Sequence, residues 1–367
     1  MSSVWGNAVR SRRISLGLGL DAVAMLGGMS AAKVEAIEAG APLSVSELER
    51  IAAALATEPA ALRRGETEGD PSRGIARFRA PLAGGLPSPA DIRTLARATE
   101  AGRVHAFLWD LLRGASQVRA LRRVLSLDTS KKPWEQGYDL GAQARERLVP
   151  ARRAIPSVQR LFEERGVLVL MLPLESASIE AASLAQPDAS PVVVLNTSLP
   201  RMRSPLPRRA ALAHELCHLL HDSSAERDLC TVLSERDSVD PIEQRASGFA
   251  PSFLAPKAWV HRGTGALPAA VRRLGESWGL SFEGAAWHAK NLRWCGHEEA
   301  AALIGEHRDV VISTPFEPDV ERVDASRAGI EVMRTPFSSS SLGDLAIEAA
   351  EKGDISSGRA AEIIAFR

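Results

Sequence analysis

The residues best placed to do chemistry lie in the segment His214-Glu215-Leu216-Cys217-His218. The flanking sequence favours a helix, and residues four apart on a helix lie one above the other on the same face. Two imidazoles at this spacing can bind one Zn²⁺, and the Glu between them can accept a proton from a water at that metal. The same pattern also arises by chance in helices, where it leaves two partly buried histidines, so a second motif must support it.

A catalytic zinc site needs a third protein ligand and an open position for water. Our candidate is Glu243, in a segment where Asp240 and Pro241 indicate the start of a helix. Spacing alone also allows Glu243 to cap that helix, because D-x-x-E is a near relative of the capping box. The intervening loop offers other carboxylates as ligands, namely Asp222, Glu226, Asp228, Glu235 and Asp237.

Two short apolar runs before the histidine motif predict buried strands. They span residues 167–172 and 192–195, and glycine, proline or asparagine bounds them. Pro205 and Pro207 suit the first turn of the helix that carries the histidines. Apolar residues spaced along this helix place it against a core, so a strand-then-helix unit holds the motif.

These segments resemble the ImmA/IrrE metallopeptidases over about residues 133–260. The resemblance rests on the strand that ends in Asn196 and on R-x-x-x-A-H-E-x-x-H-L-L-H at residues 209–221. It also rests on E-x-x-A-x-x-F-A-x-x-x-L-x-P at residues 243–256. In that family the two helix histidines and the Glu of the second motif bind zinc, and the Glu of the first motif is the catalytic base.

The resemblance therefore implies Zn²⁺ as cofactor, His214, His218 and Glu243 as its ligands, and Glu215 as the base. Cys217 departs from the family, which usually has a small residue there. Its thiol could approach the metal, since Zn²⁺ binds thiolate well, or it could simply fill space in the core.

Several residues around the two motifs are further candidates for roles in the site. His221 lies close to the ligand face one turn on, where it could contact substrate or support a ligand, or be a partly exposed residue near the helix end. Ser247 stands where many family members have Asn. Tyr138, the single tyrosine, is expected to pack, and His261 and His288 are candidate donors to an oxyanion.

Residues 4–64 predict five short helices. A glycine-bearing turn joins the second and third, with Ser30 as the N-cap of the third and Gly40 as its stop. Two helices joined in this way form a helix-turn-helix. The pattern resembles the XRE (lambda-repressor-like) family, notably at residues 38–40 and 48–55, which implies binding of double-stranded DNA.

The candidate DNA contacts of this domain are Ser30, Lys33, Arg12 and Arg13. They are few, and residues 1–64 hold seven Lys or Arg against six Asp or Glu. DNA binding draws much of its affinity from neutralising phosphates, so a helical module used for pairing or docking is an equal alternative. Helix-turn-helix proteins often pair, which makes a homodimer an expected state.

We expect a mostly helical α+β fold: an all-α helix-turn-helix domain, a zincin-like metallopeptidase domain with a small sheet, and a helical C-terminal extension. The expected boundaries are residues 1–64 for the helix-turn-helix domain, 65–89 for a linker, 90–128 for a helical spacer, 129–300 for the metallopeptidase domain and 301–367 for the extension. The predicted helices span residues 90–127 (broken near Gly114), 134–148, 267–274 and 281–292, and a turn that includes Gly275 and residues 278–280 separates the last two. We also expect an irregular stretch at 314–341 and a terminal pair of helices at 344–352 and 356–364.

Composition sets wide limits on function. The 367 residues are 45% hydrophobic, enough for two or three cores, and 45 basic side chains balance 45 acidic ones. No apolar run reaches the length of a membrane span, so we expect no membrane partner. Three cysteines, an odd and sparse count, indicate reduced thiols and hence a cytoplasmic protein.

Two functions follow. The first is a zinc-dependent endopeptidase with a regulatory helix-turn-helix module, which by resemblance cleaves a repressor-like regulatory protein in a stress, phage or mobile-element response. The second is a DNA-binding transcription regulator or antitoxin-like protein whose metallopeptidase-like domain senses a signal with little turnover. An intact Glu215 favours the first, since a sensor has no need of a base.

Overall fold

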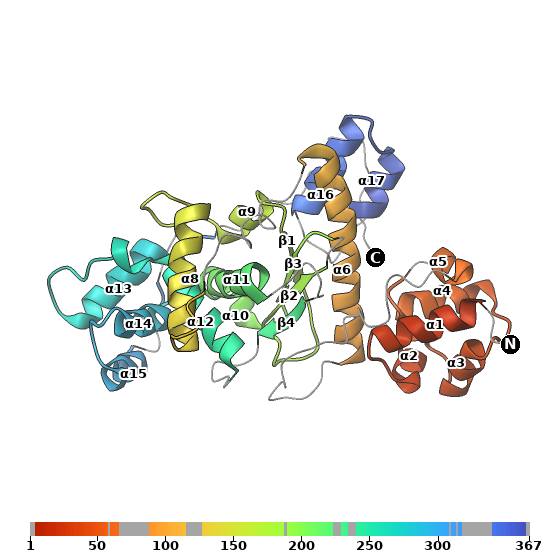
Figure 1. Cartoon of the computed structure of the whole chain (residues 1–367), viewed down its shortest axis with the longest axis horizontal. Coiled ribbons are helices and arrows are strands. Elements are labelled where there is room, and N and C mark those ends of the chain that lie inside the picture. Colours follow the sequence, from red (N-terminus) through yellow and green to blue (C-terminus); the bar gives the residue numbers. More distant parts are fainter. Residues whose placement is uncertain are drawn as a thin grey trace.

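The structure is a computed structural model that describes residues 4–57, 59–65, 88–114, 127–186, 189–222, 229–233, 240–307, 310–312, 315–317 and 340–364. These residues are mostly helical and include a four-stranded sheet, which agrees with the expected α+β class (Figure 1). No helix among them is both long and apolar enough to cross a membrane.

The five helices expected near the N-terminus are present. They are α1 (Val4–Ser15), α2 (Leu20–Gly27), α3 (Ala31–Glu38), α4 (Val45–Ala54) and α5 (Pro59–Arg64). Gly28 ends α2 in the left-handed region (φ 60°), and the Ser30 side chain accepts the Lys33 backbone N–H at the start of α3. The helices are thus confirmed, whereas the XRE assignment and DNA binding remain predictions.

The long helix α6 (Pro89–Leu112) lies between the N-terminal helices and the sheet (Figure 1). It begins at Ser88, whose side chain caps the helix by accepting the Asp91 backbone N–H. It ends two residues before Gly114, which has a φ of 81°. The predicted break near Gly114 is confirmed, and the helix predicted beyond it falls on residues 115–126, outside the described part of the chain.

The sheet has the strand order β1-β3-β2-β4, with β1 (Leu168–Leu172) parallel to β3 (Val192–Asn196). β2 (Ala181–Ala185) runs antiparallel to both β3 and β4 (Leu229–Leu233). β1 and β3 are the strands that the apolar runs predict. β2 and β4 were not predicted, and the small residues of β2 carry little strand preference of their own.

Alternation along the strands divides the core into two layers. Leu168, Leu170 and Leu172 share a cluster with α6, whereas Val169 lies in the cluster that contains α11 (Pro205–Cys217). The same period places Ala181 and Ala185 of β2 on the α11 side. Ser183 lies midway between these two alanines and therefore faces α11.

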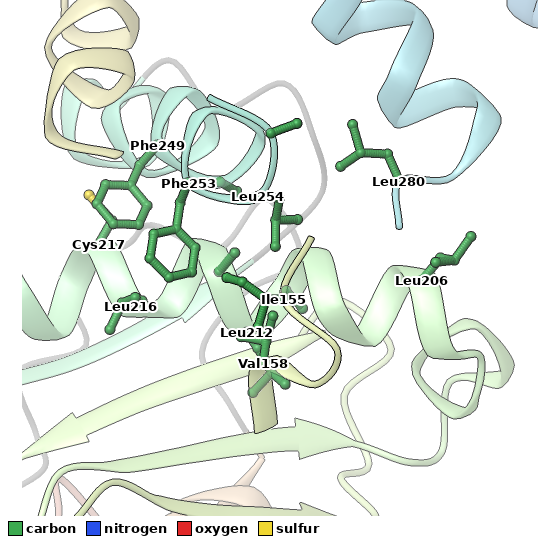
Figure 2. Packing of buried hydrophobic residues seen from close by; sticks show 14 of the residues in the cluster. Ile155, Val158, Leu206, Leu212, Leu216, Cys217, Phe249, Phe253, Leu254 and Leu280 are labelled. Carbon is green, nitrogen blue, oxygen red and sulfur yellow. The ribbon is translucent and has the colours of Figure 1, made fainter. Parts of the chain in front are cut away.

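Helices α8 (Pro133–Leu148) and α12 (Pro241–Leu254) pack closely on each other and on α11. Glycines allow this approach: a Cβ on Gly141 would lie 2.5 Å from the backbone oxygen of Phe249. Figure 2 shows Phe249 and Phe253 of α12 directed at the α11 residues Leu212, Leu216 and Cys217. The apolar face predicted for α11 is therefore buried as expected.

The shorter elements of this domain complete the layer around α11. They are α9 (Val158–Glu163), α10 (Pro200–Arg203), the π-helical turn η2 (His218–Asp222) and the 3₁₀ turn η3 (Lys257–Trp259). Beyond them come α13 (Leu267–Trp278), α14 (Phe282–Asn291) and α15 (His297–Glu306), and finally α16 (Ser340–Glu351) and α17 (Ser357–Ile364).

One local prediction about the C-terminal half was wrong in its bounds. The first helix of the predicted pair does not end at Leu274, because α13 continues through Gly275 to Trp278. The turn predicted at residues 278–280 is confirmed, since Gly279 has the positive φ (69°) that a helix end favours. Most of the stretch 314–341, which was predicted to be irregular, lies outside the described residues; residues 315–317 are neither helix nor strand, and α16 begins at Ser340. The terminal helical pair is confirmed as α16 and α17, of which α16 packs on α6 and α17 packs on α16 (Figure 1).

Candidate metal centre

The two motif histidines lie on successive turns at the C-terminal end of α11. His218 keeps helical dihedrals (φ −60°, ψ −46°), so the helix carries both imidazoles to the same face without a break. Their Nε2 atoms lie 3.1 Å apart. Both residues are buried, and this separation places two ring nitrogens close enough to share one cation.

Glu243, in the first turn of α12, joins the two imidazoles. Its Oε2 lies 3.1 Å from His214 Nε2, and its Oε1 lies 3.4 Å from His218 Nε2. The helix start is capped by Asp240, whose Oδ1 accepts the Ile242 backbone N–H, so Glu243 is not needed as the cap. The capping-box alternative for Glu243 therefore does not describe the structure.

These three residues offer ligand atoms that all lie within 4.8 Å of one another. No other group of this kind occurs among the described residues. Their side chains are exposed by only 6%, 0% and 7% for His214, His218 and Glu243. Two imidazole nitrogens and one carboxylate form the donor set of many catalytic zinc sites, and their burial together is costly without a cation, so the residues fit Zn²⁺.

The charge balance of Glu243 supports the same fit. Burial on its own would raise the pKa of this carboxyl, but the hydrogen bond and positive charge of His214, together with His218, lower the pKa overall. The carboxyl is thus held as the carboxylate, the form that binds a metal. Of the other carboxylates, Asp222 lies beside His218 (Oδ2 to Nδ1, 2.8 Å), and the remaining four lie outside the described residues.

Glu215 lies on the same helix and is completely buried. Ser183 of β2 donates its hydroxyl to Glu215 Oε2 and also lies 3.2 Å from the Glu215 backbone oxygen. Oε1 of Glu215 has no hydrogen-bond partner among the described residues. Burial raises the pKa of Glu215 to about 7, a value suited to a general base near neutral pH.

Ser183 and Arg245 are residues of this site that sequence reasoning missed. Ser183 belongs to a strand that has no sequence signal, so nothing connected it to Glu215. Arg245 donates through Nη2 to Asp222 Oδ1, and its only signal is its position two residues after Glu243.

Cys217 is not one of the three residues whose ligand atoms converge, although its thiol is close enough to Arg245 to interact with it. Its side chain sits beside Phe249 in the apolar cluster between α11 and α12 (Figure 2). Burial raises the pKa of this thiol well above its ordinary value. The structure thus places Cys217 as a space-filling residue rather than a ligand.

His221 is partly buried in η2 beside Asp222. Burial lowers the pKa of His221, and the nearby Arg245 lowers it further. The hydrogen bond to a motif histidine that we considered for His221 is made by Asp222 instead. A contact between His221 and substrate remains a prediction.

The candidate oxyanion donors fare differently. His288 is buried, and its ring nitrogens face the Tyr138 hydroxyl and the Ala255 carbonyl oxygen (2.8 Å). Both ring nitrogens of His288 therefore already have hydrogen-bond partners, and Tyr138 packs against His288. His261 is exposed.

The candidate DNA contacts of the N-terminal domain are not gathered on one exposed face. Arg13 forms a two-pronged ion pair with Glu38, and Arg12 donates to the backbone oxygens of Leu55 and Ala56. The side chains of Arg13 and Arg12 are only 15% and 11% exposed, and their guanidinium groups bind within the domain, so this arrangement does not favour DNA contact through them.

The remaining two candidates lie at α3. Lys33 pairs with Glu47 at 2.9 Å, and Ser30 serves as the N-cap. Neither residue is buried, so a role in contacting DNA remains a prediction for both.

Residues 162–286 match the model of the IrrE N-terminal-like domain, Peptidase_M78. This span contains the three convergent residues, Glu215 and the sheet, so the match supports a zincin-like metallopeptidase domain in this part of the chain. It does not include the N-terminal helices, α6, α8 or the last two helices. Comparison with curated proteins gives no match, and neither does comparison with solved structures.

Proposed function

We propose that the chain is a zinc-dependent endopeptidase whose N-terminal helical domain is regulatory. The observation that carries this proposal is the convergence of His214, His218 and Glu243 within 4.8 Å, next to a buried Glu215, inside the segment that matches a metallopeptidase domain. Two helices bring four residues suited to zinc chemistry to one place. A chance H-E-x-x-H pattern, which leaves only two buried histidines, does not explain this arrangement.

His214, His218 and Glu243 would hold the zinc ion, leaving a position open for water. When bound, Zn²⁺ lowers the pKa of a water ligand toward neutrality and polarises the carbonyl of a peptide bond. The protein itself must then supply a base and hold it in place.

Glu215 is suited to be that base. Ser183 occupies its Oε2, so the proton acceptor is Oε1, which has no other partner among the described residues. Glu215 would take a proton from the attacking water and pass it to the leaving amine.

The substrate and the N-terminal domain complete the proposal. The resemblance to ImmA/IrrE peptidases supports a repressor-like protein as substrate, in a stress, phage or mobile-element response. The N-terminal domain rests against α6, where Arg12 Nη2 lies 3.5 Å from Glu100 Oε1. This contact supports a regulatory role in which the N-terminal domain influences the peptidase unit through α6.

The test uses the whole chain with and without Glu215→Gln. We expect both proteins to bind about one zinc per chain. Only the wild type should cleave, with peptide libraries and candidate repressor proteins as probes, because the amide of Gln cannot accept the proton. Equal cleavage by both proteins, or a wild type that takes up no zinc, would refute the proposal.

A further inference from the structure

We propose that Asp222 and Arg245 are positioning residues that fix the His218 imidazole as a metal ligand. The inference rests on the proposed zinc site and goes beyond it. It concerns two residues that would touch neither metal nor substrate, and it assigns the strength of metal binding partly to a contact between η2 and α12.

The first link joins His218 to Asp222. His218 Nδ1 lies 2.8 Å from Asp222 Oδ2, a hydrogen-bond distance, and His218 is fully buried. A neutral imidazole that donates its Nδ1–H to a carboxylate presents an unprotonated Nε2. That Nε2 is the atom that faces His214 and Glu243. The carboxylate therefore sets both the tautomer and the ring orientation that a metal requires.

The backbone explains why Asp222 is the residue that reaches the ring. Residues His218–Asp222 form a π-helical turn. Asp222 follows His218 by four residues, the same spacing that places His214 and His218 on one face, and the π turn keeps the Asp222 and His218 side chains together. Asp222 thus stands over His218, and its burial shields the contact from water.

The second link joins Asp222 to Arg245. Arg245 Nη2 donates to Asp222 Oδ1, the oxygen that His218 does not use. Both side chains are nearly buried, at 11% and 6% exposure. Asp222 is therefore held from two sides and cannot turn away from the imidazole without leaving Arg245 buried and unpaired.

Arg245 also ties the two halves of the metal site together. It lies on α12 two residues after Glu243, so one helix supplies both the third candidate ligand and the restraint on the second. The order Arg245–Asp222–His218 runs from α12 back to the histidine helix. Any movement between α11 and α12 would disturb the carboxylate ligand and the His218 ring at once.

The experiment measures the zinc dissociation constant of the whole chain by competition with a chelating dye. Asp222→Ala should weaken zinc binding by about 10- to 100-fold, the usual effect of removing the carboxylate behind a ligand histidine. Asp222→Asn keeps an oxygen that can accept from Nδ1, so it should retain more affinity. Arg245→Met should weaken binding less than Asp222→Ala, since the first link survives.

The decisive comparison is the double variant. Because Arg245 acts through Asp222, adding Arg245→Met to Asp222→Ala should cause little further loss of zinc affinity. Asp139→Ala is the matched control: this aspartate of α8 has a side chain that is 46% exposed and pairs with Lys131, and its loss should leave zinc binding unchanged. The visible absorption of the Co²⁺-substituted proteins reports the ligand geometry independently of any cleavage.

The outcomes separate this inference from the proposed function. A wild type that binds zinc, with Asp222→Ala binding equally well and giving the same Co²⁺ spectrum, would overturn the positioning role and leave the peptidase proposal intact. A wild type that binds no zinc would remove both. Should Asp222→Ala fail to fold, as judged by circular dichroism, Asp222→Asn and Arg245→Met carry the same comparison.

Discussion

Replacing Glu317 with Ala should destabilise the domain that contains α11 more than any exposed substitution. Glu317 is fully buried and has a left-handed φ of 53°, in a segment far along the chain from α11. Its Oε1 accepts from Ser157 Oγ (2.7 Å) and the Gln159 N–H (2.8 Å), and its Oε2 accepts from the Val158 N–H (2.8 Å). The carboxylate thus caps α9.

The same carboxylate pairs with Arg209 on α11. Arg209 Nη1 lies 3.5 Å from Glu317 Oε2, and both side chains are inaccessible to solvent. Burial lowers the pKa of Arg209 to about 10, and Glu317 opposes that shift. Removing one partner of a buried ion pair costs about 3–5 kcal/mol, because the other charge is left uncompensated. We therefore expect Glu317→Ala to lose about 4 kcal/mol of unfolding free energy.

Urea denaturation followed by tryptophan fluorescence measures this loss. Glu276→Ala, which breaks an exposed pair with Arg272, is the matched control and should cost less than about 1 kcal/mol. Combining Glu317→Ala with Arg209→Met should recover part of the lost stability, because no buried charge then remains unpaired. A Glu317→Ala protein as stable as the control, or a double variant that loses the full sum, would refute the reasoning.

Two further predictions concern pH and helix packing. Burial lowers the pKa of His105 to about 4 from its ordinary 6.5, so the unfolded chain binds the proton at a higher pH than the folded protein does. The contribution of neutral His105 to stability is therefore complete above pH 6.5 and decreases by up to about 3 kcal/mol as the pH falls toward 4. The unfolding free energy of His105→Gln, measured by denaturation at a series of pH values, should change less between pH 6.5 and pH 4 than that of the wild type. An equal change in both proteins would contradict the role given to His105. A Cβ on Gly137 would collide with the backbone oxygen of Arg245, so Gly137→Ala should cost about 1–3 kcal/mol of unfolding free energy and weaken zinc binding. The control is Gly305→Ala, which has open space around it and should be neutral or slightly stabilising. A Gly137→Ala protein with wild-type stability would show that α8 and α12 do not need this close approach.

Sequence patterns predicted the parts of the site that have a local period. The i, i+4 spacing of His214 and His218 placed them on one helix face, and the apolar period of α11 placed that face against a core. The short apolar runs predicted β1 and β3. Glu243 required the family resemblance, because its spacing from Asp240 fitted a helix cap equally well.

The residues that support these groups have no such period. Ser183 belongs to a strand of small residues, whose conformation is set by pairing with β3 and β4 rather than by its own preference. Asp222 follows His218 at a helical spacing, but that spacing does not distinguish a partner of the imidazole from the alternative metal ligand that we considered Asp222 to be. Glu317 acts across about a hundred residues of sequence, and a single buried carboxylate leaves no mark on the local pattern.

X-ray absorption at the zinc edge tests the central claim most directly, when recorded on the purified wild type and on Glu243→Ala. The account predicts about one zinc per chain, with only nitrogen and oxygen neighbours at about 2.0–2.2 Å and the multiple-scattering signature of two imidazoles. Glu243→Ala should lose an oxygen neighbour and much of its zinc. A wild type without zinc, a sulfur neighbour at about 2.3 Å from Cys217, or a spectrum that Glu243→Ala leaves unchanged would contradict it.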